Sequence, residues 1–363
     1  KCLNRTNLPT PSKAARNANK NFDTILWTGD TSGNNRRIRG LNFQPDLIII
    51  KSRHTSNQYN VYDSSRGVNK HLTLDNNYGQ STTANSMSAF YPDGFEVGTG
   101  ASDNTNGYSY VAWCWKAGTG AVLNQDGNWN AQVNANRENG FSIITYDGAG
   151  SGMTIGHGLE RAPEFIMFKA LTSSPHGAQN WRCYHHMANQ GTNPANYTAY
   201  INLVNTFSAD NTVMNDTAVT DSIITLGSSP AVSYTGQPYV AYAWHSVEGF
   251  SKMGGYYGNA QADNARIETG FKPAWIMVKR YGASGDWAIW DSTRATTNPA
   301  NNNLTSNATS PEASAGSIPI DITSTGFTIR SSGSTVGTFE YYIYVAFAEA
   351  PTNAGFGAVV NAR

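Results

Sequence analysis

The stretch from Phe43 to Lys51, which reads FQPDLIIIK, decides the fold because the chain contains it in three versions. The second version is APEFIMFK, ending at Lys169, and the third is FKPAWIMVK, ending at Lys279. In each version a proline precedes the lysine by six positions, with an apolar strand between them. A second apolar segment follows each version, and the three segments read YVAWCW from Tyr110, YVAYAW from Tyr239 and YVAFA from Tyr344. One structural plan is therefore written three times.

The repeats are the size of domains. Pro45, Pro163 and Pro273 are spaced by 118 and then 110 residues, whereas solenoid repeats span roughly 20–50 residues. Short runs of β-branched and aromatic residues alternate with turns rich in Gly, Asn, Ser and Thr. We therefore expect an all-β fold of three tandem antiparallel β-sandwich domains.

The domain boundaries follow from the repeats and from the polar ends. We expect an N-terminal arm or linker, three sandwich repeats of which the second has longer loops, and a C-terminal tail. The corresponding ranges are 1–20, 21–120, 121–248, 249–350 and 351–363.

The second apolar segment of each repeat has two different faces, because side chains alternate along a strand. Small residues, such as Ala112 and Cys114, fall on one face, and bulky rings, such as Trp113 and Trp115, fall on the other. We interpret this strand as the packing spine of each unit and its rings as core. Aligning the Tyr110, Tyr239 and Tyr344 segments puts Cys114 level with Ala243 and Ala348, and Cys183 aligns with Val61 and Ile289. Both cysteines are therefore expected to be buried and free. Cys2 lies in the polar N-terminal segment.

Charge and hydropathy exclude several classes of partner. Lys plus Arg equals Asp plus Glu at 25 each, so no electrostatic attraction to nucleic acid or to an anionic membrane is expected. No segment approaches the roughly 20 apolar residues that cross a bilayer, so membrane insertion is not expected. The chain does not begin with methionine, so we expect either a processed or a partial form of a longer polypeptide.

The only candidate ligand-binding residues come from a motif that two copies share. Asp63 and Arg66 follow one strand, and Asp291 and Arg294 follow its counterpart. The second copy has His185-His186-Met187-Ala188 at these positions. An Asp-Ser-x-Arg segment ties down a turn readily, and we favour this structural role. A duplicated ligand pocket is the alternative.

No catalytic, metal or cofactor site is expected. The lysine at the end of each first strand recurs in every copy, which favours a packed stem with a solvated or paired ammonium group over catalysis. Adjacent residues on a strand point to opposite faces, so His185 and His186 form a poor chelate. The acidic residues form no recurring pair that would indicate glycoside hydrolysis.

Taken together, the repeated segments over residues 22–350 resemble a family of tandem-repeat structural proteins encoded by tailed phages of marine bacteria, including cyanophages. The resemblance rests on segments such as Phe22–Asp30, Val61–Gly67, Tyr110–Lys116 and Phe271–Lys279. It implies a virion protein of the tail-fibre or spike type with lectin-like or jelly-roll-like domains, located on the surface of the phage particle, and it supplies no catalytic residues to carry over.

From this resemblance we expect a protein that attaches the particle to the host cell. Its expected partners are other virion proteins, further copies of itself (a trimer being one plausible arrangement) and a host-surface glycan. Two alternatives remain open: capsid decoration or another structural role without a ligand, and, less favoured, a polysaccharide depolymerase.

Overall fold

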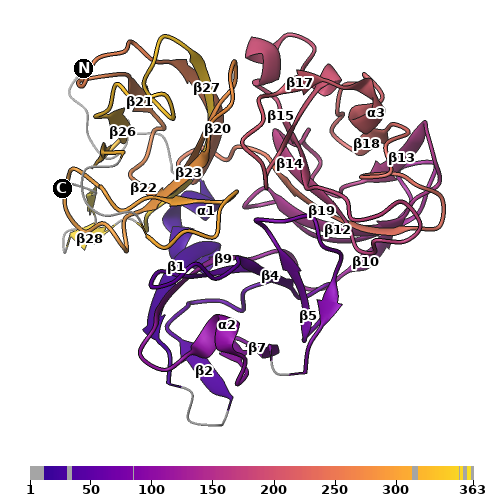
Figure 1. The fold of residues 1–363 in the computed structure, drawn as a ribbon, viewed down its shortest axis with the longest axis horizontal. Helices are drawn as coiled ribbons and strands as arrows, with labels where there is room; N and C mark the ends of the chain where they lie inside the picture. The colour runs from indigo at the N-terminus through magenta and orange to yellow at the C-terminus, as the bar shows by residue number, and fades with distance from the viewer. Residues whose placement is uncertain are drawn as a thin grey trace.

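The computed structural model describes residues 12–30, 35–84, 86–312, 318–350, 352–354 and 358–360. The chain is almost entirely β, with 42% of its residues in strands and 6% in helices. Three lobes, which we call units 1, 2 and 3 in chain order, surround a common centre (Figure 1). Each unit consists of a large antiparallel sheet and a small one, so the expectation of an all-β, sandwich-type fold is confirmed.

Unit 1 occupies the first third of the chain. Its large sheet has the order β1 (Phe22–Thr28), β9 (Ser109–Trp115), β3 (Leu47–Ser52), β4 (Asn60–Asp63), β5 (Lys70–Thr73) and β6 (Ser81–Thr82). Its small sheet has the order β2 (Arg36–Arg39), β8 (Gly94–Val97) and β7 (Met87–Tyr91), and the short helix α2 (Ala101–Asn104) precedes β9.

Unit 2 repeats this order and extends it by a hairpin. Its large sheet runs β10 (Val122–Asn124), β11 (Ala131–Asn136), β12 (Phe141–Asp147), β19 (Pro238–Trp244), β14 (Phe165–Ala170), β15 (Arg182–His185), β16 (Tyr197–Tyr200) and β17 (Ser208–Ala209). The small sheet pairs β13 (Met153–Gly156) with β18 (Ile223–Leu226), next to α3 (Asn211–Met214). The equivalents of β12 in units 1 and 3, β1 and β20, are edge strands, so the β10–β11 hairpin belongs to unit 2 alone.

Unit 3 closes the ring of units. Its large sheet runs β20 (Ser251–Tyr257), β27 (Tyr341–Ala348), β22 (Pro273–Arg280), β23 (Trp287–Asp291) and β24 (Leu304–Thr305). Its small sheet has the order β21 (Arg266–Glu268), β26 (Gly326–Ile329) and β25 (Ile320–Thr323). Beyond it, β28 (Thr352–Ala354) pairs antiparallel with β29 (Ala358–Val360).

The strand register corrects one part of the sequence alignment. Leu47 pairs with Trp115, Phe165 with Trp244, and Trp275 with Phe347. The residue equivalent to Cys114 and Ala243 is therefore Ala346 and not Ala348, a shift of two positions in the third copy. The alternating pattern matches itself after a shift of two residues, so the alignment changed while every side chain kept its face.

A tyrosine near the start of each of these strands confirms the corrected alignment. The hydroxyl oxygens of Tyr110, Tyr239 and Tyr342 each accept a hydrogen bond from a backbone N–H four or five residues upstream, at 2.9, 2.8 and 3.0 Å. These bonds fix the turn that leads into the strand. The equivalent tyrosine in unit 3 is thus Tyr342, not Tyr344.

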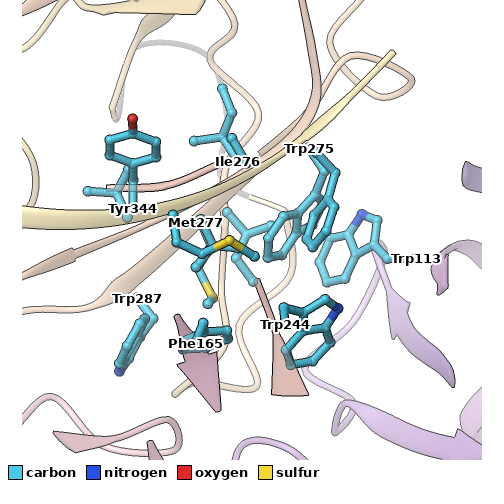
Figure 2. Close-up of a cluster of buried hydrophobic side chains, with 14 of the residues drawn as sticks. Trp113, Phe165, Trp244, Trp275, Ile276, Met277, Trp287 and Tyr344 are labelled. Atoms are coloured by element: carbon cyan, nitrogen blue, oxygen red, sulfur yellow. The ribbon is translucent and has the colours of Figure 1, made fainter. Parts of the chain in front are cut away.

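The two faces of the large sheets belong to different cores. Small residues of β9, such as Ala112 and Cys114, pack inside their own unit with Ile48 and Phe95. The rings on the opposite face point to the centre of the molecule, where the large sheets of all three units meet. Figure 2 shows Trp113, Trp244 and Trp275, one from each unit, converging there, and Trp275 contacts the rings of both Trp113 and Trp115. The rings are core, as expected, but it is a core that the units share.

The shared core is closely packed. It leaves a cavity of only about 30 Å³, lined by apolar side chains from all three units. Residues 12–20, which the sequence assigns to an arm or linker, form the helical turns α1 (Lys13–Arg16) and η1 (Ala18–Lys20), and Ala14 and Ala18 are buried against this core. Residues 1–11, including Cys2, lie outside the described residues. Cys114 and Cys183 are buried and free, as predicted, and burial raises the pKa of both thiols.

Candidate functional site

The four candidate ligand residues lie at interfaces between units. Asp63 and Arg66 form an ion pair that is almost completely buried, and Asp291 and Arg294 form an equivalent one. The Tyr242 hydroxyl of unit 2 donates to Asp63 Oδ2 at 2.6 Å. Burial of both partners closes the two pairs to a ligand from solvent.

The second of these pairs makes the same kind of contact. Trp113 Nε1 of unit 1 donates to Asp291 Oδ2 of unit 3 at 3.0 Å. Trp113 and Tyr242 occupy equivalent positions on β9 and β19, opposite Ile49 and Met167. The shared Asp-x-x-Arg motif therefore anchors a ring of the neighbouring unit, in addition to tying down its own turn.

The unit 2–unit 3 interface has a neutral group at the position of the ion pair. The position equivalent to Trp113 and Tyr242 is Val345, which has no side-chain donor. An aspartate facing it would lack a partner, and the position of the arginine is taken by Ala188. His185 stands there instead, fully buried, with Nε2 3.1 Å from the carbonyl oxygen of Tyr344 in unit 3.

The hydrogen bonds of His185 define its tautomer. Its Nδ1 accepts from the backbone N–H of Met187 at 3.1 Å, so the ring proton is on Nε2 and is donated to Tyr344. Burial, with a smaller effect of nearby His186, lowers the pKa of His185 to about 3. The neutral ring thus satisfies both nitrogens.

The three repeated lysines also hold the interfaces together. Each ammonium group donates to a carbonyl oxygen of its own unit and to one of the preceding unit in the ring. The contacts across the interfaces are Lys51 to Thr309 at 2.8 Å, Lys169 to Asn77 at 2.9 Å and Lys279 to Val204 at 2.9 Å. The ammonium groups also lie 5.4–5.9 Å from the ring centres of Tyr59, Trp181 and Trp287.

These lysines differ from the expectation of a solvated or ion-paired ammonium. All three residues are fully buried, and backbone carbonyls, which a sequence does not reveal, are their hydrogen-bond partners. Burial lowers the pKa of Lys169 to about 7 and those of Lys51 and Lys279 to about 8. Lysine suits this position in all three copies because one ammonium group has several donors and can bridge two loops from different units.

Two cavities next to the Asp-Ser-x-Arg turns bear on the alternative of a duplicated pocket. A cavity of about 420 Å³ is lined by Ser64 and Ser65, and one of about 450 Å³ by Ser292 and Thr293. The described linings do not include Asp63, Arg66, Asp291 or Arg294. The four candidates are therefore residues of the interfaces, and the turns only border these cavities.

A larger cavity lies beside the hairpin that unit 2 alone possesses. Its volume is about 690 Å³, and its lining comes from unit 2. Leu123 of β10, Gln132 of β11 and Thr145 of β12 face one another across adjacent strands and form its floor. Thr145 is on the same sheet face as Ile143, which belongs to the shared core. Ala131, Tyr146 and Tyr239, which also line the cavity, belong to the core of unit 2 itself, so the cavity lies where both faces of the sheet end.

Trp129, in the hairpin loop, forms one wall of this cavity and remains 44% exposed. Its backbone N–H donates to the carbonyl oxygen of Thr154 in β13 at 3.1 Å. Asn128 exchanges two hydrogen bonds of 2.7 Å with Thr154, one through its side-chain oxygen and one through its own N–H. A Cβ on Gly127 would lie 2.2 Å from the same carbonyl, so this close approach requires glycine. The indole is therefore carried on a loop clamped to the small sheet.

The polar side chains of the cavity leave hydrogen-bonding groups available. Among the described residues, Gln132, Thr145 and Asp147 make no side-chain hydrogen bond within the chain. At the opposite wall, the carbonyl oxygen of Leu171 accepts from the N–H of Gln80 in unit 1 at 2.7 Å. The site is therefore open, partly apolar and rich in unpaired polar groups, and it lies next to the unit 1–unit 2 interface.

Sequence reasoning missed this site. Its signal was an apolar pair, Val122-Leu123, and Trp129 in an otherwise polar segment that has no counterpart in the other copies. The described residues contain no cluster of three or more His, Cys, Asp or Glu side chains suited to a metal ion. No described helix has the length and hydropathy to cross a membrane.

The fold and these interfaces define a class of all-β protein in which three sandwiches close around one core. Residues 17–351 match the model of a family described as "Domain of unknown function (DUF7483)", and the chain belongs to this family. The match spans all three units. No curated protein and no solved structure matches the chain.

Proposed function

We propose that the protein is a virion component of a tailed phage, an appendage subunit of the tail-fibre or spike type that attaches the particle to the surface of the host cell. The phage assignment is supported by the resemblance of the repeated segments. The attachment role is supported by the way that the molecule divides its residues between a rigid interior and one specialised outer region.

The observation that carries the attachment role is the β10–β11 hairpin. The residues common to the copies are used in the cores and interfaces, which leaves little of the repeated pattern for binding. The hairpin is present once, and Val122 and Leu123 on it are 66% and 54% exposed. Exposed apolar side chains grouped on a rigid scaffold are typical of contact surfaces.

Binding to whole cells tests this role. The labelled protein is incubated with a panel of marine bacteria, including cyanobacteria, and bound protein is measured by flow cytometry. We expect saturable binding to a subset of strains, competed by unlabelled protein. A protein that binds no strain, while immunogold labelling finds it on the capsid, would support the second candidate, a purely structural decoration protein; the closed interfaces suit that role equally well.

A further inference from the structure

We propose that the cavity beside Trp129 binds a neutral oligosaccharide, with one sugar ring stacked on the indole. The inference rests on the proposed attachment function and names its ligand class and site. It follows from the chemistry of the lining, the fixed backbone of the loop that carries Trp129 and the charge of the cavity.

The lining combines the two surfaces that a sugar presents. The C–H face of a pyranose is apolar and packs on aromatic and aliphatic side chains, such as those of Trp129 and Leu123. Its hydroxyl groups both donate and accept, which matches the amide of Gln132, the hydroxyl of Thr145 and the carboxylate of Asp147. These three side chains have no hydrogen-bond partner among the described residues, so they bind a ligand without breaking a bond inside the protein.

The charge of the cavity selects against anionic ligands. The described lining residues include no lysine, arginine or histidine, and their one charged side chain is Asp147. A phosphate, sulfate or uronate would meet a carboxylate and no compensating cation. Nucleic acids and acidic polysaccharides are therefore disfavoured relative to a neutral glycan.

The site is also preorganised. Asn128 and Gly127 hold the hairpin loop against β13, so the backbone that carries Trp129 is in place before a ligand arrives, and binding costs little ordering of the loop. The cavity of about 690 Å³ falls within the usual range of 300–1,000 Å³ for small-molecule sites. Its open form suits an internal segment of a longer polysaccharide chain.

The decisive experiment compares Trp129→Ala with a matched control, Phe339→Ala. Phe339 is 77% exposed in unit 3 and does not line this cavity. The probes are a glycan array and neutral hexasaccharides (maltohexaose, cellohexaose, chitohexaose and mannohexaose), with hexameric alginate as the acidic counterpart. Affinity is measured by titration calorimetry and by the fluorescence of the tryptophans, and folding of each variant by thermal melting.

We expect wild type and Phe339→Ala to bind at least one neutral glycan, Trp129→Ala to lose at least tenfold in affinity, Gln132→Ala to bind more weakly, and alginate to bind least. Unchanged melting separates this loss from misfolding. A wild type that binds no neutral glycan, or prefers alginate, overturns the inference. Cell binding that Trp129→Ala leaves unchanged overturns the site while the attachment function stands; absence of cell binding by wild type overturns the attachment function itself.

Discussion

The unit 1–unit 2 and unit 2–unit 3 interfaces have the same geometry but different chemistry. At the first, the buried Asp63–Arg66 ion pair accepts a hydrogen bond from Tyr242 of the neighbouring unit. At the second, the neutral ring of His185 donates to a backbone carbonyl of the neighbouring unit. The residue that faces each site accounts for the difference. The Tyr242 ring carries a hydroxyl donor and therefore requires an acceptor, whereas Val345 has no side-chain donor and requires none. An interface can thus keep its shape while its dependence on charge and pH changes.

The largest expected effect comes from removing the carboxylate at the charged interface. Asp63→Ala leaves Arg66 buried without an anion, and we expect a loss of about 3–5 kcal/mol in the free energy of unfolding, measured by denaturant titration. Asp291→Ala is expected to cost less, because Arg294 Nη1 lies 3.7 Å from a second carboxylate, Glu312. Glu138→Ala, which removes an exposed ion pair, is the control and is expected to change little. Equal losses from Asp63→Ala and Glu138→Ala would contradict the structural role of the buried pair.

The neutral interface is expected to be sensitive to acid. The pKa of His185 is about 3 in the folded protein and 6.5 without its surroundings, so the unfolded chain binds more protons between these values. Stability therefore falls as the pH drops from 6.5 towards 3, and the contribution of His185 at pH 5 is a loss of about 2 kcal/mol. His185→Gln, which retains a donor for Tyr344 but does not titrate, is expected to lose less stability between pH 7 and pH 5. Buried His157 titrates in both proteins and cancels in the comparison.

The interpretation of His185 depends on that difference. If wild type and His185→Gln lose the same stability between pH 7 and pH 5, the acid sensitivity arises elsewhere. Stability at each pH is measured by thermal melting, and hydrogen exchange of β27 provides a local readout of the unit 2–unit 3 interface.

The smallest expected effect concerns the lysines that all interfaces share. Lys169→Met keeps most of the apolar stem but leaves the carbonyl groups of Asn77 and Gln179 without their donor, at an expected cost of about 1–2 kcal/mol in unfolding free energy. Lys279→Met should cost a similar amount, because its contacts are equivalent although its interface contains His185. The exposed Lys70 provides the control for loss of a positive charge. A much larger effect at one interface than at the other would show that the lysines do not act alike.

Much of the fold could be predicted from local patterns. The apolar stretches that end at the three lysines form β3, β14 and β22, and the alternation along β9 assigned each side chain to the correct face. The same alternation limited the accuracy with which the three copies could be aligned. A pattern that repeats every two residues cannot fix the register by itself. Only the strand partners showed that Ala346 is equivalent to Cys114.

The interfaces could not be predicted because their partners are distant in sequence or belong to the backbone. Nothing near Asp63 identifies Tyr242, 179 residues away, as its hydrogen-bond donor. The lysines bind carbonyl groups, which every residue possesses and no sequence distinguishes. A signal existed in the aromatic residues that follow each lysine, Tyr59, Trp181 and Trp287, but it indicates an interface only once the units are placed around the centre.

Carrying all three sandwiches on one polypeptide has a consequence for how the molecule can diversify. In a ring of identical chains, association depends on concentration, and any insertion in the sequence appears in every subunit. Here closure is unimolecular, so dilution does not dissociate the ring. The β10–β11 extension can consequently occur in one unit, once per ring, while the other two units lack it.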